Sequence, residues 1–284
     1  MLHHEGKNRY EDFGRIEQLA KAYTDGFVHS GELVKFRMKK HGASSSGIPG
    51  EKFVIFNQNH DQIGNRVKGE RLSVLVSFDR LKLAAAALFL SPYLPMLFMG
   101  EEYGEDNPFF YFVNHTDKQL IEDVRNGRQK EFEAYKWDVR PPDPQDESTF
   151  VNSRIDWLKR LSGNYRTLLE WNRKLISLRK TDPALKNTSK DGLFVYINNE
   201  LSIILHRKSE DEQKHLLCFF NFSEYMINFH VPSYSSSWIK IIDSRDAEWK
   251  DEKKRDSEDV PSPDKLTTDK LTINPCSVVI YGNG

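Results

Sequence analysis

The chain has 284 residues, of which 38% are hydrophobic and 12% aromatic, so it can bury the core of one large domain or of two small ones. Its 41 Lys and Arg residues nearly balance its 42 Asp and Glu residues, which leaves a formal net charge of -1. This balance excludes the basic excess that attracts nucleic acid or an anionic membrane, and we predict neither as a partner. A globular protein with an uncharged ligand fits the composition best.

Cysteine content and hydropathy predict the compartment. The two cysteines, Cys218 and Cys276, are too few for a disulfide framework and are predicted to be free, buried thiols. Residues 1–7 contain no apolar stretch that could act as a signal peptide. The uncharged segment Leu83–Gly100 is interrupted by two prolines, which favours a buried helix and strand over a membrane span. We therefore predict a cytoplasmic location.

The first half of the chain predicts a parallel β-α-β unit. Residues 13–40 show apolar positions at helical spacing, which indicates a surface helix and its exit. After a Gly- and Ser-rich stretch, the continuous apolar run Phe53–Phe56 is typical of a strand buried on both faces. A helix over Ser77–Leu90 and a second buried strand over Leu94–Phe98 complete the unit. The loops after the two strands lie where parallel α/β folds carry their chemistry.

The second half changes to β patterning. Residues 137–152 predict an ordered surface loop, and Ile155–Arg179 has the periodicity of a long helix. From Leu193 onward, short apolar runs separated by polar turns predict a separate all-β domain. The runs are Phe194–Ile197, Leu201–His206, Leu216–Phe222, Ile227–Val231, Trp238–Ile242, Leu271–Ile273 and Val278–Tyr281. The charge-dense stretch Asp246–Asp264 is predicted to be a solvated hairpin or loop.

Polar residues are most concentrated directly after the first predicted strand, in Asn57-Gln-Asn-His-Asp-Gln-Ile-Gly-Asn-Arg66. His60 and Asp61 place a donor beside a carboxylate, and the neighbouring amides include Asn59 and Gln62. Such groups bind sugar hydroxyls. The alternative, a polar loop that only caps a strand, is disfavoured by the density of the run.

A metal site is the rival interpretation of His60 and Asp61, in combination with one of several histidines elsewhere (His3, His4, His41 or His115). No two histidines have the i, i+4 spacing of a helical zinc motif, so we predict no metal. The chain also lacks a glycine-rich phosphate loop and a Gly-x-Ser-x-Gly elbow, which disfavours nucleotide chemistry and serine hydrolysis. We predict no cofactor.

Glu101 and Glu102 follow the second predicted strand, and the aromatic run Phe109–Phe112 comes soon after. One of two adjacent carboxylates at a strand end is expected to point inward, where it could hydrogen-bond a hydroxyl. The aromatic residues could stack on sugar rings or pack in the core, and the sequence leaves both interpretations open.

These motifs resemble the α-amylase superfamily of glycoside hydrolases, in which a strand ending in Asn-His-Asp supplies the carboxylate that stabilises the transition state. That carboxylate corresponds to Asp61. Within the superfamily the longer match resembles the malto-oligosyltrehalose trehalohydrolases. It comprises Tyr10-Glu-Asp-Phe-Gly14, Gly26-Phe-Val28, Asn59-His-Asp-Gln-Ile-Gly-Asn-Arg66, Gly69-Glu-Arg71, Pro95-Met-Leu-Phe-Met-Gly-Glu-Glu-Tyr-Gly104 and Val124-Arg-Asn-Gly-Arg128.

The resemblance implies an α/β fold in two domains. Residues 1–186 would form the incomplete C-terminal part of a (β/α)8 barrel, with its last two strands. Residues 187–284 would form a small all-β sandwich domain. It implies cleavage of the α-1,4 bond next to a terminal trehalose unit, in trehalose biosynthesis, with malto-oligosyltrehalose or another α-glucan as partner. Asp61 is the implied catalytic residue. The implied substrate-binding residues are Asn59, His60, Gln62, Arg66, Glu101 and Glu102.

Retaining cleavage needs three carboxylates in this superfamily, and on the family plan the sequence supplies only Asp61. The nucleophile and the general acid stand on earlier strands, so we expect this chain alone to be inactive and to be a truncated form. A second chain that supplies the missing strands is one alternative. Others are a non-catalytic carbohydrate-binding or structural remnant, and a fragment of a related branching enzyme or amylase.

Overall fold

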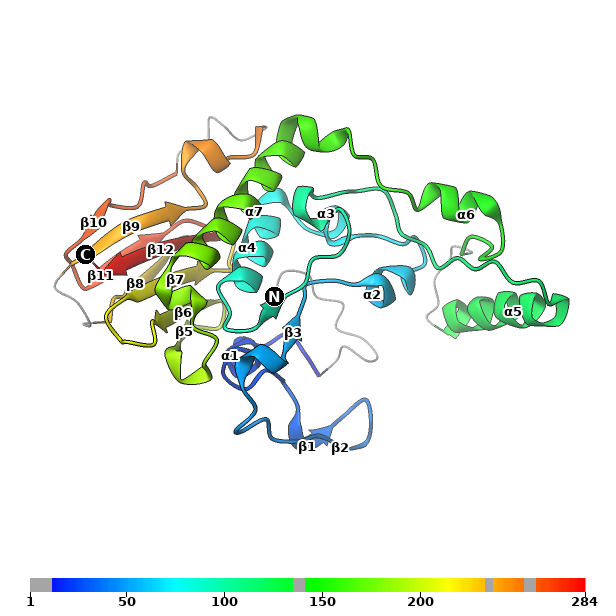
Figure 1. The fold of residues 1–284 in the computed structure, drawn as a ribbon, viewed down its shortest axis with the longest axis horizontal. Helices are drawn as coiled ribbons and strands as arrows, with labels where there is room; N and C mark the ends of the chain where they lie inside the picture. The colour runs from blue at the N-terminus through cyan, green and yellow to red at the C-terminus, as the bar shows by residue number, and fades with distance from the viewer. Residues whose placement is uncertain (1–11, 135–140, 233–236, 253–258, 284) are drawn as a thin grey trace. The chain divides into compact units, whose positions relative to one another are not determined.

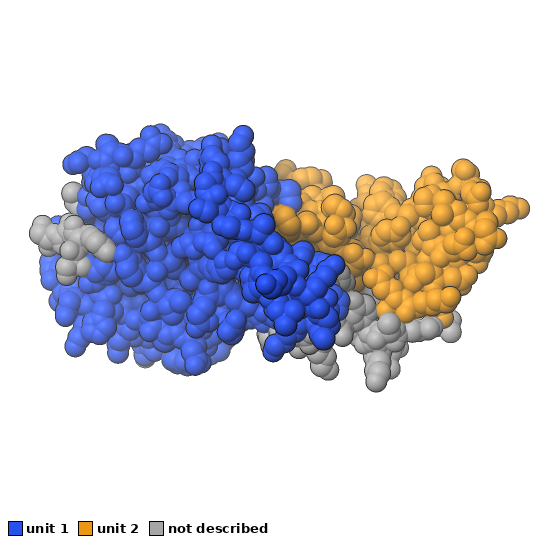
Figure 2. Space-filling model, turned by 90° about the horizontal axis from the view of Figure 1, so that it is seen from below, with its two compact units in different colours: residues 1–55, 78–96, 170–284 blue, residues 56–77, 97–169 orange. Residues whose placement is uncertain are grey.

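The computed structural model describes residues 12–134, 141–232, 237–252 and 259–283. The chain forms two compact units, each assembled from separate segments (Figure 2). Unit 1 comprises residues 1–55, 78–96 and 170–284, and unit 2 comprises residues 56–77 and 97–169. The domain boundary expected after residue 186 stays a prediction, because these units group segments by contact and not by chain order.

Parts of the sequence analysis fall outside the described residues: His3, His4, Tyr10 and Glu11, residues 137–140 of the predicted surface loop, and residues 253–258 of the predicted charged loop. The described helices are α1 (Ile16–Asp25), α2 (His60–Gly64), α3 (Leu72–Leu75), α4 (Phe78–Phe89), α5 (Lys118–Ala134), α6 (Glu147–Asn152), α7 (Gly163–Thr181) and α8 (Pro183–Lys186). The described strands are β1 (Ser30–Val34), β2 (Lys39–Gly42), β3 (Val54–Ile55), β4 (Leu94–Pro95), β5 (Leu193–Asn199), β6 (Ser202–Lys208), β7 (His215–Asn221), β8 (Ile227–His230), β9 (Trp238–Asp243), β10 (Lys265–Leu266), β11 (Lys270–Ile273) and β12 (Ser277–Asn283).

A six-stranded antiparallel sheet dominates unit 1 (Figure 1). Its strand order is β10-β9-β12-β7-β6-β5, and β8 pairs with β11 in a second antiparallel sheet. Side chains from both sheets share one core, which includes Phe219, Phe229, Ile273 and Tyr281. Helix α4 packs against β12, and helix α1 packs against β5. The strands predicted from Leu193 onward are confirmed, and β10 is an addition to them.

The predicted helices are confirmed, with one change of bounds. Helices α1 and α4 fall within the ranges predicted for them. The long helix predicted over Ile155–Arg179 begins only at Gly163, whose φ of +60° is left-handed and so cannot extend a right-handed helix backwards. The preceding residues form a short 3-10 turn in which Leu161 is exposed. Helices α5 and α6 and the hairpin β1–β2 are elements that the sequence pattern does not predict.

The parallel pairing of the first two predicted strands is confirmed, but their burial is not. β3 pairs with β4 in parallel, with Val54 opposite Leu94. Val54 is 56% exposed and Leu94 is 42% exposed, so the prediction that the first strand is buried on both faces and that the second strand is buried is wrong at these residues. Among the described strands, this sheet contains only β3 and β4, and a parallel strand is buried on both faces only when neighbouring strands and helices cover it.

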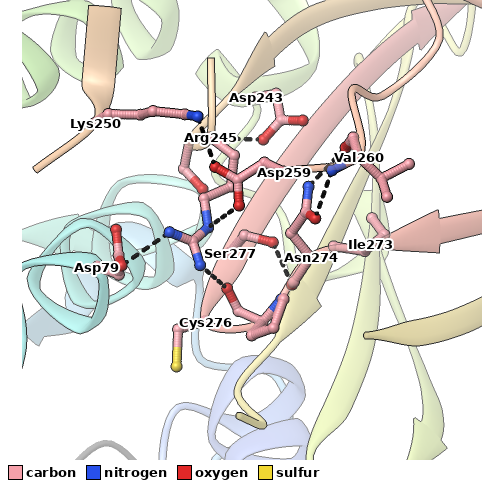
Figure 3. A network of polar contacts seen from close by, with 12 residues as sticks. Asp79, Asp243, Arg245, Lys250, Asp259, Val260, Ile273, Asn274, Cys276 and Ser277 are labelled. Atoms are coloured by element: carbon pink, nitrogen blue, oxygen red, sulfur yellow. Dashed lines mark hydrogen bonds and ion pairs between the residues drawn. The ribbon is translucent and has the colours of Figure 1, made fainter. Parts of the chain in front are cut away.

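A network of charged side chains joins α4 to the segment after β9 (Figure 3). Arg245 Nη1 lies 2.9 Å from Asp79 Oδ2. Lys82 is fully buried, lies 3.1 Å from Asp79 Oδ1, and donates hydrogen bonds to the carbonyl oxygens of Ser244 and Trp249. Because buried charges are costly unless they are paired and hydrogen-bonded, these contacts fix the arrangement of α4 and the β9 segment.

The prediction of a solvated loop for Asp246–Asp264 holds at Asp264, whose side chain is 95% exposed, but is wrong at Trp249, Lys250 and Asp259. Trp249 is buried, and the Asp259 carboxylate lies 3.1 Å from Lys250 Nζ and 3.8 Å from Arg245 Nε. The side chain of Asp259 is only 13% exposed. Charge density therefore reflects internal ion pairs at these positions instead of a solvated surface.

The two cysteines are free and buried, as predicted. Burial raises the pKa of the Cys218 thiol to about 12, so this group stays protonated and packs as a small apolar side chain. Among the described helices, none has the length and apolar character needed to cross a membrane.

Replacing Lys82 by Ala is expected to lower the free energy of unfolding by about 3–5 kcal/mol, because it leaves the buried Asp79 carboxylate and two carbonyl oxygens without this donor. Urea denaturation measures the change. Lys174, an exposed residue of α7, provides the control, and Lys174→Ala is expected to change stability by no more than about 0.5 kcal/mol. Equal effects of the two substitutions would contradict a stabilising role for the network.

Candidate functional site

The polar segment after β3 folds into the short helix α2, which begins at the N-cap residue Asn59. Asn59 Oδ1 accepts a hydrogen bond from the Gln62 backbone N–H at 3.0 Å, and Gln62 Oε1 accepts one from the Asn59 backbone N–H at 3.0 Å. This reciprocal capping box occupies the side-chain oxygens of two predicted sugar-binding residues. Asn59 and Gln62 therefore shape the loop, and their binding role stays a prediction.

Asp61 and His60 lie in the first turn of α2 with their side chains in solvent. The Asp61 side chain is 74% exposed and that of His60 is 70% exposed. His60 Nε2 lies 3.5 Å from Asp61 Oδ1, so the two groups form one polar pair. This exposure allows both side chains to contact a ligand directly, as their predicted roles require.

Arg66, the last residue of the predicted polar segment, is turned away from solvent. Its Nε lies 3.4 Å from Glu70 Oε2, and the side chain is 21% exposed. The ion pair ties the exit of α2 to the following loop. The structure therefore gives Arg66 a structural partner, and sugar binding by this residue stays a prediction.

Glu101 is the inward-pointing carboxylate expected at the end of the second strand. Its Oε1 accepts a hydrogen bond from Asn57 Nδ2 at 3.2 Å, and its Oε2 accepts one from the Phe98 backbone N–H at 3.0 Å. Burial raises the pKa of the carboxyl group to about 7, although hydrogen bonds from Phe98, Asn57 and Gln58 act to lower it. Glu101 thus links the two strand-end loops and can bind or release a proton near neutral pH.

The neighbouring Glu102 is partly buried in a 3-10 turn, Glu101–Tyr103, which lies between Gly100 and Gly104. Both glycines have left-handed φ angles, of 82° and 77°. A Cβ atom at Gly100 would also lie 2.6 Å from the Glu105 Cβ, so glycine is required there. The turn holds the two adjacent carboxylates in different environments.

The rings of the aromatic run Phe109–Phe112 contact one another and the rings of Phe98 and Phe150. Phe109 lies edge-on to Phe98 with ring centroids 5.1 Å apart, and Phe112 makes similar contacts with Phe109 and Phe150 at 5.7 and 5.2 Å. Edge-to-face pairing is a favourable arrangement of aromatic rings. Tyr111 is 40% exposed and Phe150 is 50% exposed, so the two interpretations that the sequence leaves open both stay predictions.

Arg71 and Gln58 are structural residues of the site that the sequence reasoning does not single out. The Arg71 side chain is fully buried and donates to the carbonyl oxygens of Asn107 and Met99, each at 2.7 Å. Gln58 Oε1 accepts a hydrogen bond from the Leu72 backbone N–H at 2.8 Å. Arg71 belongs to one of the quoted motifs, but only the folded chain reveals which carbonyl groups it reaches. Together these bonds connect the loops that carry Asp61 and Glu101.

Among the described residues, no group of three or more His, Cys, Asp and Glu side chains is arranged to hold a metal ion. The geometry instead provides one exposed carboxylate beside an imidazole, and one enclosed carboxyl group with a raised pKa. Such an arrangement suits hydrogen bonding to a polyhydroxylated ligand and electrostatic stabilisation of positive charge.

Comparison with solved structures defines the class of fold. A Salmonella typhimurium protein assigned to the α-amylases superposes with a TM-score of 0.80 and 29% sequence identity, over 100% of this chain and 44% of that one. An isomaltulose synthase from Erwinia rhapontici superposes with a TM-score of 0.50 and 16% identity, which supports the fold alone. The chain therefore has the fold of part of an α-amylase-type enzyme.

Curated relatives narrow the resemblance to the malto-oligosyltrehalose trehalohydrolases, as the motifs predict. The enzyme from Saccharolobus solfataricus is 44% identical over 176 residues, which are 62% of this chain and 29% of the relative. The enzyme from Mycobacterium tuberculosis is 34% identical over 209 residues, which are 72% of this chain and 36% of the relative. The chain thus spans about a third of the length of the curated relatives that it matches. No protein-family model matches the chain.

The raised pKa of Glu101 predicts a pH-dependent stability. The folded state holds a proton up to about pH 7, whereas an unfolded glutamate loses it near 4.5, so folding takes up a proton between these values. The free energy of unfolding of the wild type, minus that of Glu101→Gln, is expected to fall as pH rises from 4.5 to 7 and to level off above 7. Chemical denaturation at several pH values checks this difference, and a flat profile would contradict the burial of the carboxyl group.

Proposed function

We propose that the chain is the C-terminal portion of a glycoside hydrolase of the trehalohydrolase type, which hydrolyses the α-1,4 bond next to a terminal trehalose unit. The observation that carries the proposal is the exposed Asp61–His60 pair after a parallel strand, in a chain 44% identical to a curated trehalohydrolase over the matched residues. The ligand is an α-glucan that ends in trehalose.

Asp61 is the residue to which we assign a catalytic role. Retaining glycosidases pass through a transition state with positive charge on the sugar ring, and a nearby carboxylate lowers its energy. An exposed carboxylate on a helix held by a capping box can present its charge to a bound ring at little cost of reorganisation. His60 is the proposed hydrogen-bond donor to a hydroxyl of the same ring.

The nucleophile and the general acid are assigned to polypeptide outside these 284 residues, in the same chain or in a second one. Exposed apolar residues of the β3–β4 sheet and directly after it support this assignment: Val54 is 56% exposed, Leu94 is 42% exposed, and Met96, which follows β4, is 37% exposed. Apolar side chains on a parallel sheet are normally covered by neighbouring strands and helices. Further strands of a (β/α)8 barrel would provide that cover.

The test combines the chain with the part of the enzyme that we propose it lacks. The residues that precede the matched region in the Saccharolobus solfataricus relative are co-expressed with this chain, and trehalose release from malto-oligosyltrehalose is measured by chromatography. The chain alone is expected to bind this oligosaccharide and release no trehalose. The co-expressed pair is expected to release it, and Asp61→Asn in this chain is expected to lower the rate at least about a hundredfold.

Asp269→Asn serves as the matched control, because Asp269 is an exposed carboxylate of the β region remote in sequence from α2. Its rate is expected to equal that of the wild type. Trehalose release by the chain alone, abolished by Asp61→Asn, would refute the assignment of the nucleophile and acid. Binding without turnover in the folded, co-expressed pair would favour a non-catalytic carbohydrate-binding remnant.

A further inference from the structure

The helix that carries Asp61 is too short to be stable without external contacts. α2 contains five residues, His60–Gly64, and isolated helices of this length do not form in water. Its N-terminal end is held by the capping box of Asn59 and Gln62. The orientation of Asp61 therefore depends on what holds the other end.

Arg128 of α5 holds that other end. Its Nη2 donates a 2.8 Å hydrogen bond to the Gly64 carbonyl oxygen, and its Nη1 donates a 2.7 Å hydrogen bond to Asn65 Oδ1. Asn65 is the C-cap residue of α2, and its backbone N–H donates to the Asp61 carbonyl oxygen at 3.2 Å. Asn65 therefore connects the two groups: its side chain accepts from the Arg128 guanidinium group, and its backbone N–H donates to Asp61.

The charge and the burial of Arg128 suit this contact. A positive charge at the C-terminal end of a helix interacts favourably with the carbonyl groups exposed there, and a planar guanidinium group can serve two acceptors at once. The Arg128 side chain is only 12% exposed. It lies 3.1 Å from Glu131 Oε2, and its guanidinium carbon lies 4.7 Å from the centre of the Tyr111 ring. These contacts restrict the guanidinium group to the position that reaches α2.

We propose that Arg128 is a positioning residue for Asp61: it closes the C-terminal end of α2 and so fixes the direction in which the Asp61 carboxylate meets the sugar. The contact between Arg128 and α2 follows from the two hydrogen bonds alone. The effect of this contact on sugar binding rests on the function proposed above. Arg128 itself does not touch the ligand. Arg125, an exposed arginine of the same helix, makes neither of these hydrogen bonds. Its guanidinium group pairs with Asp143 and Glu122 instead.

Amide hydrogen exchange tests the contact to α2 without any ligand. In the full chain, Arg128→Ala is expected to speed exchange in a peptide covering residues 58–68 by about tenfold, because two hydrogen bonds to α2 are lost. Arg128→Lys keeps the charge and one donor, so an intermediate increase is expected. Arg125→Ala removes an arginine from the same helix and is expected to leave this peptide unchanged. Equal exchange in Arg128→Ala and wild type would overturn the proposal.

Binding of malto-oligosyltrehalose, measured by isothermal titration calorimetry at a temperature where all variants are folded, tests the consequence for the sugar. Arg128→Ala is expected to weaken binding about tenfold, Arg128→Lys less, and Arg125→Ala not at all. If Arg128→Ala speeds amide exchange in the 58–68 peptide but leaves the affinity for the oligosaccharide unchanged, Arg128 does not position Asp61 for the ligand. Absence of binding by the folded wild type would count against the proposed function, and the exchange experiment would still decide whether Arg128 holds α2.

Discussion

The buried guanidinium group of Arg71 is the interaction on which the candidate site depends. It lies in one strand-end loop and donates to two carbonyl oxygens of the other, those of Met99 and Asn107, so it connects the two loops. Removing the group would leave the carbonyl oxygens of Met99 and Asn107 without these donors. Asp61 and Glu101 keep their relation to each other through this framework.

The same framework gives two carboxyl groups opposite environments. Asp61 is largely in solvent beside an imidazole, whereas Glu101 accepts two hydrogen bonds inside the loops and has a pKa near 7. The two groups therefore differ in what they can contact: the Asp61 carboxylate faces solvent, and the Glu101 carboxyl group joins the loops. Both residues lie in polar motifs of the sequence. The difference in their environments comes from burial, which only the folded structure shows.

The sequence predicts the elements well where apolar periodicity follows from burial. The strands from Leu193 onward and the helices α1 and α4 are such cases, because their apolar residues face a core. Prediction fails where apolar residues stay exposed, as at Val54 and Leu161, and where a charged residue is buried in an ion pair, as at Asp259. The polar segment with Asp61 is visible in the sequence. Arg128 is not identifiable as its neighbour, since 63 residues separate Arg128 from Asn65 and no pattern records their contact.

The place of β12 in the main sheet affects how the protein is made. This strand, the last that the structure describes, lies between β7 and β9 and pairs with both. Until residues 277–283 have left the ribosome, β9 and β10 have no connection through the sheet to β5, β6 and β7. The β region is therefore completed only once β12 has been synthesised, and the apolar faces of its earlier strands stay available to chaperones until then.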